Sequence, residues 1–220
     1  MKKKVLNPIP PLPKAVQITW WACRALLFIW GSVMMFSGYT TEFLEAMFGI
    51  IFTHLWDLFQ LLGGKTFITL VPHRVQTMLN ILICFGVVVG TTVNKFTTFE
   101  YIDIPEHFMS GFIATAGSYD LAVIIQSKQP KDKRISPALA VMFSLAFGCT
   151  LLLGWEFYEF TMDRLYGLNL QRSVFNSEAG LIDTMIDLIF GAAGSLAGMF
   201  YTIFGRIIRE KKRGSNKDEK

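Results

Sequence analysis

The stretch 154–198, GWEFYEFTMDRLYGLNLQRSVFNSEAGLIDTMIDLIFGAAGSLAG, decides how the chain is interpreted. It consists of two apolar runs joined by a polar link, and each run carries carboxylates at helical spacing. The carboxylates are Glu156, Glu159 and Asp163 in the first run, and Asp183 and Asp187 in the second. The spacings i, i+3, i+7 and i, i+4 place each set on one helix face. An acidic side chain in hydrocarbon costs roughly 2.5–3.5 kcal/mol on insertion scales, so these groups should face a partner, a cavity or an ion.

The composition indicates a membrane protein with several spans. Of the 220 residues, 52% are hydrophobic and 17% are charged, and the mean hydropathy is +0.41. These values exclude an ordinary soluble domain of this length. The net charge of +4 does not indicate nucleic-acid binding, because the basic residues gather beside apolar runs: in the N-terminal leader, in segment 128–134 and in the C-terminal tail. Such a distribution indicates membrane topology.

Six apolar segments predict an all-α transmembrane bundle. The expected spans are 18–39, 43–62, 75–93, 107–125, 137–160 and 180–204. The chain then divides into a basic, proline-rich leader (1–17), one transmembrane domain (18–207) and a charged tail (208–220), which we expect to be disordered beyond Gly214.

Basic residues also predict the orientation of the spans. With six spans, only Lys95, Arg164 and Arg172 of the 21 Lys and Arg residues fall on the outer side, so both termini should be cytoplasmic. His107, at the start of the fourth span, then meets the five carboxylates in the outer part of the membrane. Gly111, Gly191, Gly194 and Gly198 are small residues at helical spacing, which favour close packing of the fourth and sixth spans.

The remaining polar residues and the cysteines fit a helical bundle. His54 and Asp57 in the second span form either a proton-relay pair or a polar contact between helices, and Asp120 is expected to be paired or to reach the inner interface. The three cysteines, Cys23, Cys84 and Cys149, lie in apolar runs without CxxC spacing. We expect them to be buried small hydrophobic residues rather than a disulfide framework or a zinc site.

Three ordered motifs resemble those of a known family. HFMSG (107–111), WEFYEF (155–160) and DTMIDLIFGAAG (183–194) are similar to the YjdF-like bacterial inner-membrane proteins, whose molecular function is unknown. The resemblance implies a multi-pass protein of the bacterial cytoplasmic membrane. A weaker likeness is to VanZ-type membrane proteins, implicated in glycopeptide antibiotic resistance; the residues that match their pattern are Glu156, Arg172, Asp183, Gly191 and Gly194. Where that family tends to have Gln and Asn, this chain has Glu159 and Asp187.

The acidic residues and the imidazole suggest a metal site. Carboxylates from facing helices with a nearby imidazole suit a divalent ion such as Mg²⁺, Mn²⁺ or Zn²⁺. The candidate ligands are His107, Glu156, Glu159, Asp163, Asp183 and Asp187, and all but Asp163 are also candidate catalytic residues. The alternative is structural: Asp183 would favour a helix N-terminus, and Glu156, His107 and Arg172 would hold helices together.

Three functions are compatible with these residues, and whether the protein is an enzyme stays open. The first is a metal-assisted hydrolase or transferase acting on lipid or envelope intermediates. The second is a transporter coupled to H⁺ or another cation, for which His54, Asp57 and Asp120 would continue the polar residues across the bilayer. The third is a non-catalytic membrane or envelope-stress factor. Membrane lipids are the expected partners, nucleic acid is not, and a homo-oligomer is left open.

Overall fold

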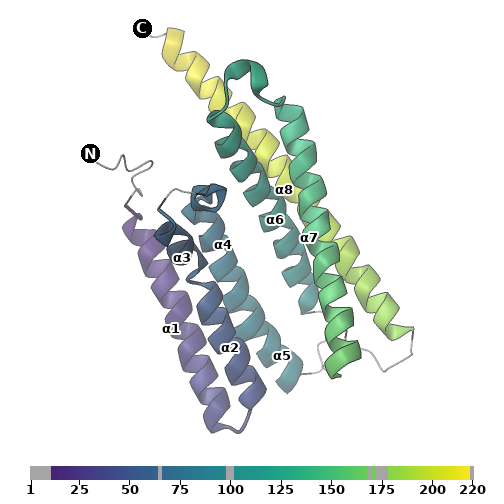
Figure 1. The fold of residues 1–220 in the computed structure, drawn as a ribbon. Coiled ribbons are helices and arrows are strands. Elements are labelled where there is room, and N and C mark those ends of the chain that lie inside the picture. Colours follow the sequence, from purple (N-terminus) through teal and green to yellow (C-terminus); the bar gives the residue numbers. More distant parts are fainter. Residues whose placement is uncertain (1–10, 64–65, 98–101, 168–169, 172–177, 219–220) are drawn as a thin grey trace. The chain divides into compact units, whose positions relative to one another are not determined.

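The computed structural model describes residues 11–63, 66–97, 102–167, 170–171 and 178–218. Within these ranges every regular element is a helix, which confirms the all-α fold class (Figure 1). The chain divides into two compact units, Met1–Glu106 and His107–Lys220.

The first unit contains three rows of helix that lie side by side in Figure 1: α1, then α2 with α3, and then α4 with its continuation. Its elements are α1 (Lys14–Phe36), α2 (Thr40–Phe52), α3 (Leu55–Leu61), the 3₁₀ turn η1 (Phe67–Leu70), α4 (His73–Cys84), the π-helix η2 (Phe85–Gly90) and α5 (Thr91–Phe96). Trp20 on α1 donates from Nε1 to Thr77 Oγ1 on α4 at 2.8 Å, and Trp30 donates to Thr92 Oγ1 at 3.0 Å. These bonds join α1 to the third row at two levels.

The second unit is built from three long helices. They are α6 (Asp103–Ser127), of which all but the first turn belongs to this unit, α7 (Pro137–Tyr166) and α8 (Ala179–Asp218), with the short 3₁₀ turn η3 (Lys131–Lys133) before α7. Local sequence sets both ends of α7. The Ser136 side chain accepts from Leu139 N at 3.2 Å, Pro137 occupies the first turn, and Gly167 ends the helix at φ 65°.

Five of the described helical segments are long and apolar enough to cross a membrane. They are Lys14–Phe36, His73–Val93, Asp103–Ser127, Pro137–Tyr166 and Ala179–Ile208. The second predicted span, 43–62, differs from the prediction because it is divided at Thr53–His54 into α2 and α3. Side chains from α1 and α4 occupy the break, as described below.

The C-terminal tail also differs from the prediction. We expected disorder beyond Gly214, whereas α8 continues to Asp218. Arg, Glu and Lys are good helix formers, and no proline interrupts them, so the apolar helix can propagate into the charged tail.

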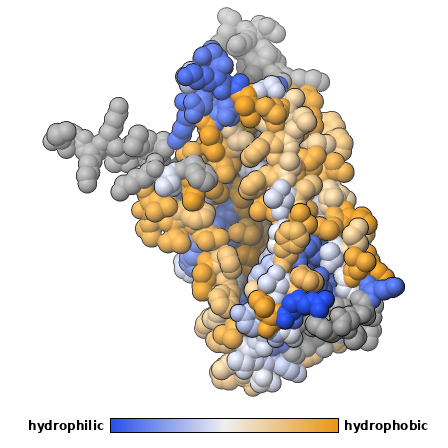
Figure 2. Space-filling view, turned by 45° about the vertical axis from the view of Figure 1, so that its right-hand side comes forward, coloured by the Kyte–Doolittle hydropathy of each residue, from blue (hydrophilic) through white to orange (hydrophobic). Residues whose placement is uncertain are grey.

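Much of the described surface is apolar. Figure 2 shows hydrophobic residues over most of the face in view. Large exposed hydrophobic side chains of the described residues include Phe36, Leu61 and Met142. An apolar surface of this extent fits contact with lipid. It also explains one wrong expectation: the three cysteines are free as expected, but Cys84 is half-buried and Cys149 is exposed, and only Cys23 is buried.

Candidate metal centre

Three buried polar residues meet within the second unit, one from each of its long helices. His107 lies in the second turn of α6, Glu156 in the C-terminal third of α7 and Asp187 near the start of α8. Their exposed fractions are 8%, 4% and 3%. Sequence spacing predicted that these residues would converge, and the structure brings these three together.

Glycines allow α6 and α8 to approach closely beside this cluster. A Cβ at Gly111 would collide with the backbone oxygen of Gly191, and a Cβ at Gly194 would collide with that of Phe108. A Cβ at Gly198 would lie 2.7 Å from the Phe112 oxygen. The expected close packing of these two helices is therefore confirmed, and it fixes how far His107 stands from Asp187.

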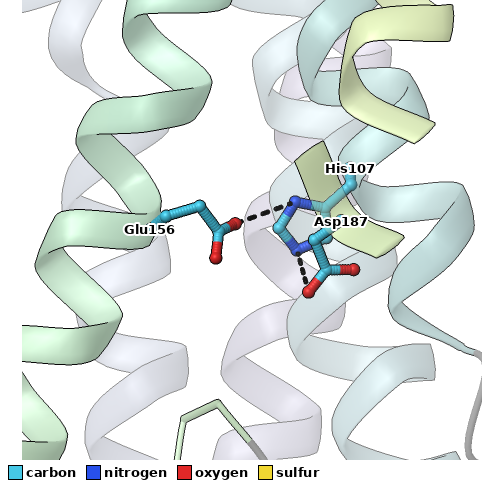
Figure 3. A group of neighbouring side chains, drawn as sticks. All are labelled: His107, Glu156 and Asp187. Carbon is cyan, nitrogen blue, oxygen red and sulfur yellow. Dashed lines mark ion pairs between the residues drawn. The ribbon is translucent and has the colours of Figure 1, made fainter. Parts of the chain in front are cut away.

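The imidazole of His107 lies between the two carboxylates (Figure 3). Nδ1 is 3.7 Å from Glu156 Oε1, and Nε2 is 3.5 Å from Asp187 Oδ2. Both distances exceed the usual N–H···O hydrogen-bond length of about 2.9 Å. One ligand atom from each of the three residues can be chosen so that all lie within 4.8 Å of one another.

Oε2 of Glu156 has no hydrogen-bond partner of ordinary geometry in the part of the chain that the structure describes, although it is buried, and the Thr184 hydroxyl lies close enough to interact with this carboxylate. Leaving a buried charged acceptor unpaired costs more than about 1–3 kcal/mol. Asp183, which is half-buried, lies close enough to Glu156 for the two carboxylates to interact electrostatically. A cation between Glu156 and Asp183 would reduce the cost of the unpaired oxygen and the repulsion between the two carboxylates.

Glu159 is buried on the same helix as Glu156. Its Oε1 accepts from Trp155 Nε1 at 2.8 Å. The carboxylate therefore has a neighbour on its own helix, and it does not belong to the group of three that meets around the imidazole. It stays a candidate ligand from the sequence.

Asp163 makes contacts of a structural kind. Its Oδ1 accepts from Leu170 N at 2.6 Å and its Oδ2 from Gln171 N at 2.9 Å, so both oxygens bind the segment after α7. Gln171 Nε2 in turn donates to Thr184 Oγ1 on α8 at 2.8 Å. Helical spacing suggested a metal ligand at Asp163 but gave no sign of these loop contacts. Arg172, the cation that we expected nearby, lies outside the described residues.

The other predicted polar pair, in the first unit, has a partner that sequence reasoning missed. Asp57 Oδ2 lies 3.1 Å from His54 Nδ1 and also accepts from Arg24 Nη2 at 2.9 Å. The available signal was an arginine inside the first apolar span, which normally requires a buried partner. Asp120 in the second unit is half-buried.

Comparisons with known proteins agree with a membrane protein. A family model described as "Predicted membrane protein (DUF2238)" matches residues 16–209. An uncharacterized protein of Thermotoga maritima is 29% identical over 144 residues, which cover 66% of this chain and 66% of that protein. No solved structure matches.

Proposed function

The chain belongs to this family of predicted membrane proteins, and on that premise we propose that it binds a divalent metal ion at a site formed by His107, Glu156 and Asp187, with His107 and Asp187 as ligands and Glu156 beside the imidazole. We further propose that the ion serves a hydrolase or transferase reaction on lipid or envelope intermediates in the bacterial inner membrane. The supporting observation is a buried imidazole with a carboxylate at each nitrogen, one of which has an unpaired buried oxygen.

The donor set fits a metal ion of the Zn²⁺ or Mn²⁺ kind. Ligand bonds of 2.0–2.2 Å in a tetrahedral site place neighbouring donor atoms about 3.4 Å apart. The Nε2–Oδ2 separation of 3.5 Å between His107 and Asp187 is close to this value. Oxygen and imidazole donors suit Zn²⁺ and Mn²⁺, and Mg²⁺ would take the oxygens.

The two nitrogens of His107 can have different roles. One nitrogen can bind the ion together with the carboxylate beside it, while the other carries a proton toward the second carboxylate. A hydrogen bond from the second nitrogen to a carboxylate fixes the imidazole tautomer and raises the basicity of the nitrogen that binds the ion. On the distances, Asp187 is the better co-ligand and Glu156 the better orienting group, because the Asp187 contact is the shorter one.

The surroundings suggest the class of substrate. A bound divalent ion polarises a phosphoryl or acyl oxygen and lowers the pKa of bound water. The three residues lie in helices that are apolar enough to cross a membrane, so a substrate with a lipid portion could reach them from the bilayer. Glu156, with its unpaired oxygen, is placed to accept a proton.

Metal content and thermal stability test the proposal. We expect the purified protein to bind one equivalent of metal and to melt at a higher temperature with Mn²⁺ or Zn²⁺. Asp187→Asn should lose both properties, and Glu156→Gln should weaken metal binding by about 10–100-fold, while both variants remain folded. In metal-free buffer they should be as stable as wild type or more stable, because one repulsive charge has been removed. Glu178→Gln is the matched control, since it neutralises an exposed carboxylate of the same unit.

The structural alternative gives the opposite result. If the residues only hold helices together, removing one member of a buried ion pair should destabilise the protein by roughly 3–5 kcal/mol. Wild type would then show no metal-dependent shift in melting temperature. These two results together would refute the metal centre.

A cation-coupled transporter remains the second candidate. An imidazolium between two carboxylates can hold a proton as well as a metal, and the ion pairs of His107 with Glu156 and Asp187 favour such a site. Proton movement into vesicles containing the purified protein, measured with a trapped pH indicator, would distinguish transport from hydrolysis. Asp187→Asn should abolish that movement if transport is the function.

A further inference from the structure

The break in the second predicted span, between α2 and α3, has only a weak local cause: the Thr53 hydroxyl donates to Ile50 O at 2.6 Å, and such back-bonding slightly destabilises and bends a helix. Residues 50–62 read IIFTHLWDLFQLL and contain neither proline nor glycine. Sharp interruptions of a helix normally occur at such residues, or where a side chain or water enters the ladder of backbone bonds. The sequence therefore permits a continuous helix, and the main cause of the break lies in the packing.

The first cause is the side chain of Gln76 on α4. In an α-helix, Trp56 N would donate to Phe52 O. Here Trp56 N donates instead to Gln76 Oε1 at 3.0 Å, and Gln76 Nε2 donates to Phe52 O at 3.0 Å. The buried amide is thus inserted into one backbone hydrogen bond and binds both groups that it separates.

The second cause is Arg24 on α1. The next backbone bond of a continuous helix would join Asp57 N to Thr53 O. Arg24 Nη2 donates to Thr53 O at 2.8 Å, and its Nε donates to Thr53 Oγ1 at 3.2 Å. The same Nη2 also binds Asp57 Oδ2, so one cation contacts both sides of the break.

Asn80 provides an independent observation, one turn beyond Gln76 on α4. Gln76 Nε2 donates to Asn80 Oδ1 at 2.6 Å, but Asn80 Nδ2 has no partner among the described residues, although the residue is fully buried. An amide pair would join Nδ2 to Gln76 Oε1, which here accepts from Trp56 N instead. If Trp56 N returned to Phe52 O, the two amides could pair through both hydrogen bonds.

From these contacts we infer that the second span is a two-state element. In the broken state seen here, Gln76 and Arg24 bind the separated backbone groups. In the continuous state, Phe52 O and Thr53 O accept from Trp56 N and Asp57 N, and the Gln76 amide pairs with Asn80. Arg24 keeps Asp57 in both states. The broken state gives partners to Phe52 O, Thr53 O and Trp56 N, and the continuous state would also give one to Asp57 N. The change moves α3 relative to α2.

This element is independent of the proposed metal centre, because all its residues belong to the first unit. An arginine and two amides buried within membrane-spanning helices are costly compared with apolar residues. Leucine at positions 24, 76 and 80 would avoid this cost. Broken helices in membrane proteins occur where backbone is buried in protein or lines a cavity, and in transporters they are often the moving parts.

Distances between spin labels test the inference. Labels would be attached to Cys at positions 44 and 61, both exposed leucines, in the full chain with Cys23, Cys84 and Cys149 replaced by Ala. A continuous helix puts the two positions 17 residues and about 26 Å apart, and a break shortens this distance. We expect Gln76→Leu to increase the 26 Å population at the expense of the shorter one.

Thr77→Val is the matched control. It removes a hydrogen bond between α1 and α4 from the neighbouring position and leaves the break untouched. It should leave the distances as in the parent protein. If Gln76→Leu fails to fold, Gln76→Asn, whose shorter side chain cannot bridge Phe52 and Trp56, takes its place with the same expected result. Unchanged distances in the folded Gln76 variant, or an equal change in Thr77→Val, would overturn the inference.

Discussion

Gly194→Ala should separate α6 from α8 and damage the cluster of buried residues between them. The new Cβ would lie 2.7 Å from the carbonyl carbon of Phe108 and 2.9 Å from its Cα, and closer still to its oxygen. Carbon atoms in ordinary contact are about 3.5–4.0 Å apart. The helices must therefore move apart by at least about 0.8 Å at this point, and by more to relieve the contact with the oxygen, because backbone atoms cannot escape by changing rotamer.

The free-energy change follows from two opposing effects. Overpacking costs about 1–3 kcal/mol, and the upper end applies because the colliding atoms belong to the backbone. Alanine has a better helix propensity than glycine by about 1 kcal/mol. The variant should therefore be less stable than wild type by about 2 kcal/mol. A shift of this size would also lengthen the contact between His107 Nε2 and Asp187 Oδ2 from 3.5 Å and weaken the proposed metal binding.

Gly154→Ala is the control, because a Cβ at this exposed position on α7 would meet no heavy atom within 4 Å. It should leave stability unchanged or raise it by up to about 1 kcal/mol. Unfolding of both variants in mixed detergent and SDS micelles, followed by far-UV circular dichroism, gives the comparison. The reasoning about close packing is wrong if the two variants differ in stability by less than about 0.5 kcal/mol.

Two further predictions concern the loop after α7 and the topology. Asp163→Asn should destabilise the protein by about 1–3 kcal/mol and speed proteolysis after α7, because only one acceptor oxygen remains for Leu170 N and Gln171 N. Thr161→Val, which alters an exposed hydroxyl, should be neutral, and equal proteolysis of the two variants would contradict the role of Asp163. Reporter fusions at Ser136 and at the C-terminus should both report the cytoplasm. An outside signal at either would reverse the assignment of faces.

The sequence predicted the features that depend on helical periodicity and on residue size. Glu156 and Asp187 were expected on inward faces because an isolated carboxylate in an apolar span needs a partner. Gly111 and Gly194 were expected at a close helix contact because only glycine leaves room for another backbone. Both arguments use one helix at a time, and spacing along a single helix is enough to make them.

The features that the sequence did not reveal depend on side chains that reach another element. Nothing near Thr53 marks a break, because the groups that replace the backbone bonds come from Arg24 and Gln76 on other helices. The helical spacing of Asp163 from Glu156 and Glu159 is the spacing expected of a ligand on the same helix face. Only the position of the loop after α7 shows that both its oxygens already accept hydrogen bonds from backbone N–H groups. A pattern of this kind identifies a polar side chain but not its partner.

The two units also show different ways of accommodating charge in apolar helices. Arg24 is buried with its carboxylate partner and a backbone oxygen, so its charge is balanced by groups that the chain itself supplies. At His107 the balance is different, because Glu156 and Asp187 bring two negative charges to one imidazole, and Asp183 adds a third near Glu156. The first arrangement is complete as a structural contact. The second can be balanced by a proton on a carboxylate or by a cation, and the metal ion that we propose there is one such cation.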